Sequence, residues 1–531
     1  MTLSSHHEGG NARAGHRLLN AVRHDEPVTA GLFDERATEQ LRAAVAGYTV
    51  DAVHDAVGLP GQAALGRGDL VGVARYLSGD GPLETLIRLF LIGADVSETA
   101  ARRALGPLPL EVACRAGLLE LSAGSVRARV DLRPYAQQTA ADAGGHDWWV
   151  VSDLGSEVHG GPLPADHVLG VGAASLTLAQ ATPRLPVGRA LDVGTGCGVQ
   201  ALHLGMHAAR VVATDISARA LRFAATTAAL SGQTWDLRTG SLLEPVAGEE
   251  YDLVVANPPF VVSAGTGGYD YRDSGRSGDG VCEALVRGLP ALLSEHGTAQ
   301  LLANWIIPSD RPWQDRLGDW LAGGRCDAWV WQREVAEPAE YVALWLRDAG
   351  ERPGTPGWAR KYDAWLDWFA AAGVAGVGMG LITLWRTDAV EPVVVLEDVP
   401  QAVEQPAGAH LPGWLERQRW LASHTDRELL DTSLTAAPGL VRERSDLLAA
   451  DGWEVAAARL RQSYGMRWEV EVDDAMAAVV AGCDGTTPLL TLMAVLAAAL
   501  QAPRDDIAAA ALPVVRDLVG RGFLVPPEAT S

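Results

Sequence analysis

Near-continuous apolar segments alternate with helical patterns over the middle of the chain, from about residue 150 to 400. Segments with apolar residues at helical spacing, such as 218–230, separate them. The apolar segments have the composition of strands that are buried on both faces; they are ALDV (190–193), RVVATDI (210–216), YDLVVAN (251–257) and AQLLANWII (299–307). This alternation predicts an α/β domain with a mostly parallel sheet over residues 151–400.

Both flanks of this domain show helical spacing instead. Near the N-terminus, residues 32–48 have the apolar positions of a helix, and a Ser-Ala-Gly-Ser turn at 122–125 between two apolar segments predicts a hairpin. After a Pro- and Gly-rich stretch at 401–413, interpreted as a linker, helical patterns precede a short strand near the C-terminus. These patterns predict two mainly helical, winged-helix-like domains over residues 1–150 and 401–531.

Composition and charge limit what these domains do. The chain of 531 residues is 48% hydrophobic, which fits several packed domains, and its formal net charge is −23. Strong non-specific binding to nucleic acid needs clustered Lys and Arg. The acidic balance therefore favours protein docking or structural support over DNA binding for the winged-helix-like ends, while a local basic patch stays compatible with it.

Cysteine usage and hydropathy predict a cytoplasmic protein without membrane association. None of the five cysteines lies within four residues of another, so no Cys-x-x-Cys metal pair exists, and a sparse, odd set fits a reducing compartment. The polar N-terminus lacks the apolar core of a signal peptide. The longest apolar run, 489–500, has about half of the roughly 20 residues that a membrane helix needs.

A glycine loop follows the first strand of the sheet domain. In ALDVGTGCGVQ the strand ends at Asp192, then come Gly194, Gly196 and Gly198, and a helical pattern is next. Glycines permit a tight turn and allow a ligand to contact the backbone, while the helix N-terminus presents free N–H groups. The next strand ends at Asp215, where a carboxylate is placed to accept hydrogen bonds from both hydroxyls of a ribose.

The acidic residue before the glycines indicates which ligand fits. The carboxylate of Asp192 would repel the pyrophosphate of a dinucleotide, but it suits a ligand that carries an ammonium group. S-adenosylmethionine has an ammonium group, a ribose and an adenine, and it has no phosphate. A glycine-rich turn in some other α/β domain is the alternative interpretation, which the second strand and its acid in register disfavour.

These segments resemble a known family. Residues 192–198, Asp215 and residues 257–260 resemble motifs of class I S-adenosylmethionine-dependent methyltransferases, and more narrowly the N-methylating branch with an Asn-Pro-Pro-Tyr/Phe signature. This branch includes glutamine methyltransferases of release factors, adenine-N6 methyltransferases and guanine-N2 methyltransferases of ribosomal RNA. The resemblance covers roughly residues 165–310 and implies a Rossmann-like methyltransferase sheet as the fold.

The resemblance also implies roles for single residues. It assigns the methionine part of the cofactor to Asp192 and the loop backbone, the ribose to Asp215, and the adenine to packing on Ile216. Ser241 stands where the family often has an acid that meets the adenine amino group, and its hydroxyl still accepts a hydrogen bond. The segment 166–180 resembles the part that closes over the cofactor. The implied cofactor-binding residues are Asp192, Gly194, Thr195, Gly196, Asp215, Ile216, Ser241, Leu242 and Asn257.

The Asn-Pro-Pro-Phe stretch ends a buried strand and indicates the chemistry. The resemblance implies that the methyl acceptor is the planar NH2 group of an amide or of an exocyclic amine. Such a group is a poor nucleophile that carries two in-plane N–H donors. The side-chain oxygen of Asn257 and the carbonyl of Pro258 form a pair of acceptors for these donors. Pro258 and Pro259 stiffen the backbone, and Phe260 can stack on the planar group. Such a grip aligns the nitrogen with a methyl donor and favours the positive charge that develops on it. A strand-ending turn without chemistry is the alternative.

Other methyl-transfer chemistries fit less well. Methylation of cytosine at C5 needs a nucleophilic cysteine after proline, and the sequence has no Pro-Cys pair. Metal-assisted O-methylation needs a cluster of carboxylates, and no such spacing is found, so we expect no metal. Cys197, inside the glycine loop, is interpreted as a small filler rather than as a nucleophile.

The substrate is open between two classes. A protein or peptide side-chain amide is favoured by the acidic composition and by Gly278-Asp279-Gly280, which loosely resembles a Gly-x-Asp-Gly of the glutamine methyltransferases. An exocyclic amine of RNA or DNA is favoured by Phe260 and by the winged-helix-like ends. Arg272 and Arg276, in the polar loop at 265–280, either contact an acidic group of the substrate or are solvated. An inactive scaffold with this fold is a third alternative, which the intact motifs disfavour, and the oligomeric state stays open.

Overall fold

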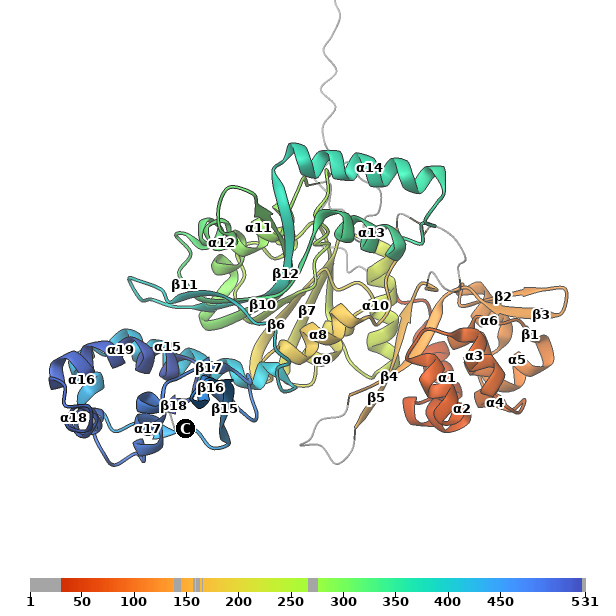
Figure 1. Ribbon diagram of the computed structural model, residues 1–531. Coiled ribbons are helices and arrows are strands. Elements are labelled where there is room, and N and C mark those ends of the chain that lie inside the picture. Colours follow the sequence, from red (N-terminus) through yellow and green to blue (C-terminus); the bar gives the residue numbers. More distant parts are fainter. Residues whose placement is uncertain are drawn as a thin grey trace, which may run out of the picture.

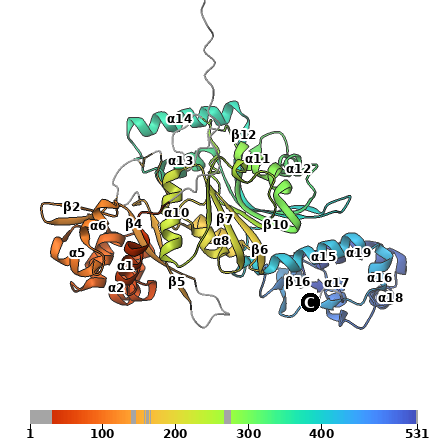
Figure 2. The ribbon, with the colours of Figure 1, turned by 180° about the vertical axis from the view of Figure 1, so that it is seen from behind.

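The computed structural model describes residues 30–137, 145–155, 158, 163–164, 166–265 and 276–527. A central sheet region lies between an N-terminal and a C-terminal part, which sit on opposite sides of it in both views (Figure 1, Figure 2). In the described part of the chain, no helix combines the length and apolar character needed to span a bilayer.

The central region, among the described residues, is built on an eight-stranded sheet. Its strands are β6 (Val187–Val193), β7 (Ala208–Asp215), β8 (Asp236–Thr239), β9 (Tyr251–Ala256), β10 (Leu293–Pro308), β11 (Cys326–Ala336), β12 (Val374–Arg386) and β13 (Val394–Asp398). Their order is β13-β11-β12-β10-β9-β6-β7-β8. Neighbours from β10 to β8 run parallel, and β12 runs antiparallel to both β10 and β11. The predicted α/β fold with a mostly parallel sheet is confirmed.

Helices cover both faces of this sheet, which explains the near-continuous apolar strands. They are α8 (Ala173–Ala181), α9 (Val199–Leu204), α10 (Ala218–Leu230), α11 (Gly280–Gly288), α12 (Trp313–Leu321), α13 (Pro338–Asp348), α14 (Pro356–Ala371) and the short η2 (Glu244–Val246) and η3 (Leu289–Leu292). Alternate residues of β6 enter two different cores. Leu191 and Val193 pack with residues of α11 and α12, whereas Ala190 packs with residues of α9 and α10.

The N-terminal part combines short helices with two small sheets. Its elements are α1 (Glu35–Val45), α2 (Val50–Leu65), α3 (Leu70–Tyr76), α4 (Pro82–Leu86), η1 (Ile87–Ile92), β1 (Val96–Ser97), α5 (Glu98–Leu105), α6 (Leu110–Arg115), β2 (Leu119–Ser122), β3 (Ser125–Ala128), β4 (Asp131–Gln137) and β5 (His146–Ser152). The predicted hairpin is present as β2 and β3, and β1 pairs with β3. The winged-helix interpretation of this part, and the predicted domain boundaries, stay predictions.

The C-terminal part contains helices and a long hairpin. Its elements are η4 (Ala407–His410), α15 (Leu411–Ser423), α16 (Asp426–Asp431), β14 (Thr435–Ala436), β15 (Leu440–Ala449), β16 (Gly452–Gln462), β17 (Glu469–Glu471), α17 (Asp474–Gly482), α18 (Leu489–Leu500), α19 (Arg504–Gly520) and β18 (Leu524–Val525). The prediction of a mainly helical domain over residues 401–531 did not include the hairpin formed by β15 and β16. The stretch 401–413, interpreted as a linker, contains the buried residues Val403, Ala407 and Leu411, so it is packed against its surroundings.

Candidate active site

Three adjacent parallel strands bring the sequence-predicted residues to one edge of the sheet. Asp192 in β6 lies opposite Ala213 of β7 and Val255 of β9. Asp215 is the last residue of β7, and Asn257 follows the last residue of β9. A Cβ atom built on Gly194 would lie 3.8 Å from the carbonyl oxygen of Asn257. The glycine loop and the Asn-Pro-Pro-Phe stretch are therefore direct neighbours at the carboxyl ends of the strands.

The glycine loop is fixed by backbone hydrogen bonds and by left-handed residues. The amides of Gly194 and Thr195 both donate to the carbonyl of Thr214, at 2.9 Å each. Gly196 has φ +57°, and no atom lies within 4 Å of a Cβ built on it, so its backbone faces open space. Gly198 has φ +92°, and a Cβ there would lie 2.6 Å from the Trp235 ring. Glycine at 198 thus permits both the turn and the close packing of the following helix α9.

Asp192 has a buried carboxyl group, and one of its two oxygens forms no hydrogen bond with the described residues. Its Oδ2 accepts hydrogen bonds from the Thr195 hydroxyl at 2.7 Å and from the Ala201 amide at 3.1 Å. Its Oδ1 is buried and has no hydrogen-bond partner among the described residues. Burial, with a smaller contribution from the nearby charge of Asp215, raises the pKa of Asp192 to about 7. An acceptor without a partner in this position is suited to a cationic or N–H-bearing ligand.

Asp215 joins the two loops at the ends of β6 and β7. Its Oδ2 accepts from the Gly196 amide at 2.9 Å, and its Oδ1 accepts from the Ser217 amide at 2.8 Å. Burial raises the pKa of this carboxyl above its ordinary value, and the hydrogen bonds from the backbone oppose that shift. Each carboxylate oxygen has a second acceptor site, so Asp215 can still accept hydrogen bonds from a ligand.

The predicted adenine-side residues surround Asp215. Ile216 is 64% exposed although it directly follows a core strand, so its side chain is accessible to a ligand. The Gly240 amide donates to the Asp215 carbonyl at 3.0 Å, which places Ser241 beside this corner. Leu242 has φ +48°, a conformation that leucine rarely adopts. Thr195, also predicted from the resemblance, is buried and contacts Asp192 through its hydroxyl.

The Asn-Pro-Pro-Phe stretch keeps its predicted acceptors available. Among the described residues, none donates a hydrogen bond to the Asn257 side chain or to the Pro258 carbonyl. Pro258 is buried, whereas Asn257, Pro259 and Phe260 are half-buried. The Phe260 ring meets the Trp345 ring edge-on, with centroids 6.0 Å apart. Two carbonyl groups without a described donor and an aromatic residue therefore follow one another in the chain directly after β9.

Side chains from α13, α14 and β10, which sequence reasoning missed, hold the segment after Phe260. The hydroxyl of buried Tyr341 accepts hydrogen bonds from the Val262 amide and from the Asn304 side chain, both at 2.9 Å. The Trp365 indole donates to the Val262 carbonyl at 3.1 Å. The Val262–Tyr341 contact joins residues 79 positions apart, and no local pattern signals it.

Asp279 of the Gly278-Asp279-Gly280 stretch has structural partners. It is buried, and its carboxylate binds the Arg316 guanidinium at 2.7 and 2.5 Å and the Ile306 amide at 2.8 Å. It therefore fixes α11 and α12 to β10, and the loose resemblance of this stretch to a Gly-x-Asp-Gly of the glutamine methyltransferases stays a prediction. Arg276 is exposed, and Arg272 lies outside the described residues.

Other groups at this edge do not add a nucleophile or a metal site. Burial raises the pKa of the Cys197 thiol to about 12, so the thiolate is scarce at neutral pH. Within the described ranges, no group of three His, Cys, Asp or Glu side chains is arranged to hold a metal ion.

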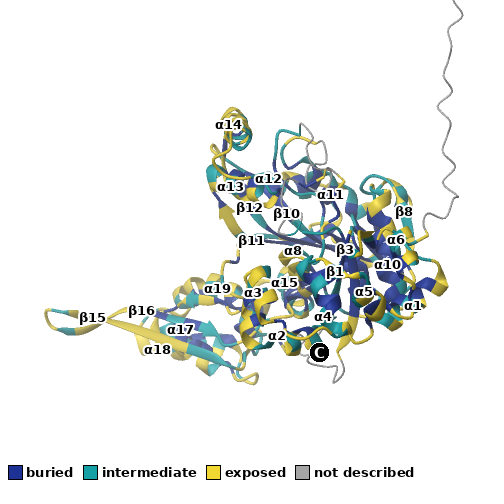
Figure 3. Ribbon diagram, turned by 90° about the vertical axis from the view of Figure 1, so that its right-hand side faces the viewer, coloured by how far each residue is buried: buried dark blue, intermediate teal, exposed yellow. Residues whose placement is uncertain are grey.

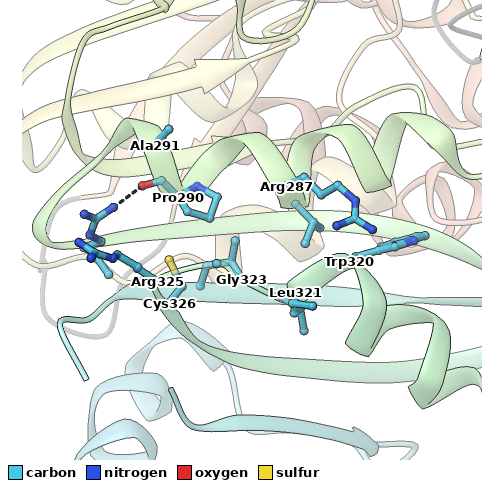
Figure 4. Close-up of a pocket in the computed structure, with 13 residues that line it drawn as sticks. Arg287, Pro290, Ala291, Trp320, Leu321, Gly323, Arg325 and Cys326 are labelled. Carbon is cyan, nitrogen blue, oxygen red and sulfur yellow. Dashed lines mark hydrogen bonds between the residues drawn. The ribbon is translucent and has the colours of Figure 1, made fainter. Parts of the chain in front are cut away.

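A cavity of about 350 Å³ lies at the opposite ends of the central strands (Figure 4). Its lining includes Pro290 before β10, Cys326 at the start of β11 and Arg386 at the end of β12. These lining residues lie near the amino end of β10. Asn257, in contrast, follows the carboxyl end of β9, which runs parallel to β10, so the two places are at opposite ends of the strands. The cavity is therefore separate from the site formed by Asp192, Asp215 and Asn257.

Comparison with known proteins identifies the central region. Residues 169–312 match the family described as "Methyltransferase small domain". Residues 45–129 and 412–526 match two domains of unknown function, DUF7059 and DUF7782. The predicted resemblance to class I methyltransferases is thereby confirmed for the central part of the chain.

Similar proteins align with only part of this chain. A "Ribosomal RNA small subunit methyltransferase C" of Chromohalobacter salexigens is 33% identical over 131 residues, which are 25% of this chain and 36% of that protein. A "Release factor glutamine methyltransferase" of Deinococcus radiodurans is 48% identical over 80 residues, 14% of this chain and 28% of that protein. The chain thus spans about a third of the length of these relatives. A solved structure of a T. thermophilus 16S rRNA N2 methyltransferase with AdoMet and guanosine is 17% identical, with a TM-score of 0.24, over 45% of this chain and 60% of that chain.

Proposed function

Because residues 169–312 are a methyltransferase domain, we propose that this chain is an S-adenosylmethionine-dependent N-methyltransferase that acts on a planar NH2 group. One observation carries the proposal: neither the Asn257 side chain nor the Pro258 carbonyl has a hydrogen-bond donor among the described residues, and the backbone of Asn257 lies beside Gly194 of the glycine loop. In a strand-ending turn with a purely structural role, the carbonyl of a buried residue such as Pro258 would normally be paired.

The residues present fit the proposed cofactor. The unpartnered Oδ1 of Asp192 would accept from its ammonium group, and the open backbone at Gly196 admits the methionine part. Asp215 would accept from the ribose hydroxyls, and exposed Ile216 would pack on the adenine. When bound, S-adenosylmethionine supplies an electrophilic methyl group on a sulfonium.

The chain's own residues would orient the nucleophile. Asn257 and Pro258 accept the two in-plane N–H bonds of the substrate, which aligns the nitrogen lone pair with the methyl group. The same two oxygens favour the positive charge that grows on nitrogen, so they bind the transition state better than the substrate. Phe260, backed by Trp345, provides a face on which a planar group stacks.

For the substrate class, the structure favours a base over a peptide. The resemblance of Gly278-Asp279-Gly280 favoured a peptide amide, but Asp279 binds Arg316, so its carboxylate has a structural partner in the folded chain. Half-buried tryptophans, including Trp345, Trp365 and Trp368, gather beside the segment that follows Phe260, and aromatic side chains bind splayed-out bases by stacking. The ribosomal RNA methyltransferase relatives agree with this. We therefore propose an exocyclic amine of an RNA base as the acceptor.

A protein side-chain amide is the second candidate. The net charge of −23 weakens binding to RNA phosphates. The release-factor glutamine methyltransferase relative has the higher local identity, 48% over 80 residues. Both acceptor classes present the same planar NH2 group, so the Asn257–Pro258 pair does not discriminate between them.

Labelling of a cell lysate tests both the activity and the acceptor. The full chain is incubated with lysate and S-adenosylmethionine that carries a tritiated methyl group, and the product is divided between nuclease and protease treatments. We expect label that nuclease releases and protease does not. Release by protease would establish the amide instead. Equal labelling by the wild type and by Asn257→Ala would refute the proposed chemistry.

A further inference from the structure

The hairpin β15–β16 projects from the C-terminal part as an arm. Every residue of β15 from Arg442 to Leu448 is exposed, and so are residues 453–456 on β16 (Figure 3). The third strand, β17, pairs only with residues 459–461 at the base. The outer arm is therefore a two-stranded ribbon, and its exposed stretch of β15 is roughly 20 Å long at about 3.3 Å per residue.

The end of the arm is apolar on both faces. We define the arm tip as Leu447, Leu448, Trp453 and Val455, which are 66%, 64%, 70% and 46% exposed. Leu448 lies directly opposite Trp453, and Val455 is on the same face, whereas Leu447 is on the other face. None of these side chains belongs to a described core cluster, and exposed apolar side chains that cluster on a projecting element are typical of an interaction surface.

The charged side chains near the arm tip that have no ion-pair partner among the described residues are all negative. Arginines along the arm are neutralised, since Arg444 pairs with Asp446 at 2.8 Å, Arg461 with Glu443 at 2.9 Å and Arg459 with Glu469 at 2.9 Å. In contrast, Asp451 in the turn and Glu454 beside Trp453 have no ion-pair partner among the described residues. The apolar arm tip is thus bordered by uncompensated negative charge.

We propose that the arm tip docks into an apolar cleft with a Lys- and Arg-rich rim on another protein. Tryptophan is the residue type most often found at the energetic centre of protein interfaces. Nucleic acid and anionic membranes would be repelled by Asp451 and Glu454. A second copy of this chain is disfavoured because the net charge of −23 is shared by both copies. This interaction does not depend on methyl transfer.

Site-directed crosslinking tests which molecule meets the arm tip. A photo-crosslinking benzoylphenylalanine replaces Val455 in the full chain inside cells, and the same residue at Val390, which is 98% exposed, is the matched control. We expect a protein adduct from position 455 that position 390 does not give. Adducts with RNA, lipid or a second copy of this chain, or none beyond the control, would overturn the proposal.

Titration of the crosslinked protein, purified, tests the recognition itself. Trp453→Ala is expected to weaken its binding to the full chain by at least about tenfold. The double variant Asp451→Asn/Glu454→Gln keeps the apolar contact and should lose most of the salt dependence of binding. Unchanged affinity in Trp453→Ala, or unchanged salt dependence in the double variant, would contradict the proposal. Cofactor binding, measured in parallel, should be equal in all variants.

Discussion

At the residue scale, the proposed contact of Asp192 with the cofactor predicts a pH dependence of cofactor binding. Its pKa is raised to about 7 by burial, so the free protein holds a partly protonated carboxyl at neutral pH. Only the carboxylate form pairs with an ammonium group. Affinity for S-adenosylmethionine should therefore level off above pH 7 and fall by about tenfold per unit well below it. Calorimetric titrations on both sides of pH 7 measure this.

Asp192→Asn is the control for that profile. The variant cannot ionise, so it should bind the cofactor more weakly and lose the Asp192 step in the profile. Any pH dependence that persists in the variant belongs to other groups, such as Asp215, whose pKa burial also raises. Identical profiles in wild type and variant would show that Asp192 does not meet the ammonium group.

The variant Asn257→Ala tests whether the proposed role of Asn257 lies in catalysis and not in cofactor binding. Asn257→Ala removes one of the two acceptors proposed for the substrate NH2 group, and it leaves Asp192 and Asp215, which are proposed to contact the cofactor, in place. We expect turnover to fall by about 100-fold or more, with the dissociation constant of S-adenosylmethionine unchanged. Single-turnover labelling and calorimetry give the two quantities. Near-normal turnover would remove Asn257 from the chemistry.

At the scale of elements, Tyr341 on α13 holds the segment after Phe260 in place through a hydrogen bond to Val262. The Tyr341 hydroxyl satisfies both the Val262 amide and the Asn304 side chain, so Tyr341→Phe leaves two buried donors without their partner. The expected result is a loss of about 1–3 kcal/mol in the free energy of unfolding, together with a lower kcat and an unchanged KM for the cofactor.

Tyr362→Phe on α14 is the matched control for Tyr341→Phe. Tyr362 stacks on Trp358 with ring centroids 4.7 Å apart, and no described group bonds its hydroxyl. Its kcat and unfolding free energy should match the wild type. A fall in stability without a fall in kcat for Tyr341→Phe would reduce Tyr341 to a core residue without a positioning role.

Elements with strong local signals could be predicted, and those held by distant contacts could not. The strands β6, β7 and β9 and the glycine loop follow from apolar runs that end at Asp192, Asp215 and Asn257. The hairpin β15–β16 was missed because its exposed strands mix charged and apolar residues without clear alternation. The burial of Asp279 was missed for a different reason: its partner Arg316 is 37 positions away, and a lone Asp between glycines looks like a loop residue.

At the scale of the whole molecule, the end parts are packed against the sheet. The Leu32 amide donates to the Thr226 hydroxyl of α10 at 2.9 Å, and the Val151 amide of β5 donates to the Thr227 hydroxyl of α10 at 3.1 Å, which ties the N-terminal part to the centre. On the other side, Asp327 of β11 pairs with Arg419 of α15 at 2.8 Å. Residues of all three parts belong to one continuous core cluster. We therefore expect the C-terminal part and the sheet to be coupled in unfolding.

Trp414 is the strongest test of that coupling. Its ring stacks on Trp329 of β11 at a centroid distance of 4.0 Å and an angle of 3°, and both side chains are fully buried. Trp414→Ala should lower the free energy of unfolding by about 3–5 kcal/mol, and hydrogen exchange should speed up in β11 as well as in α15. Trp453→Ala, at the exposed arm tip, is the matched control and should stay within about 0.5 kcal/mol of the wild type. Faster exchange confined to α15 would mean that the C-terminal part opens without disturbing the sheet on which the methyltransferase site is built.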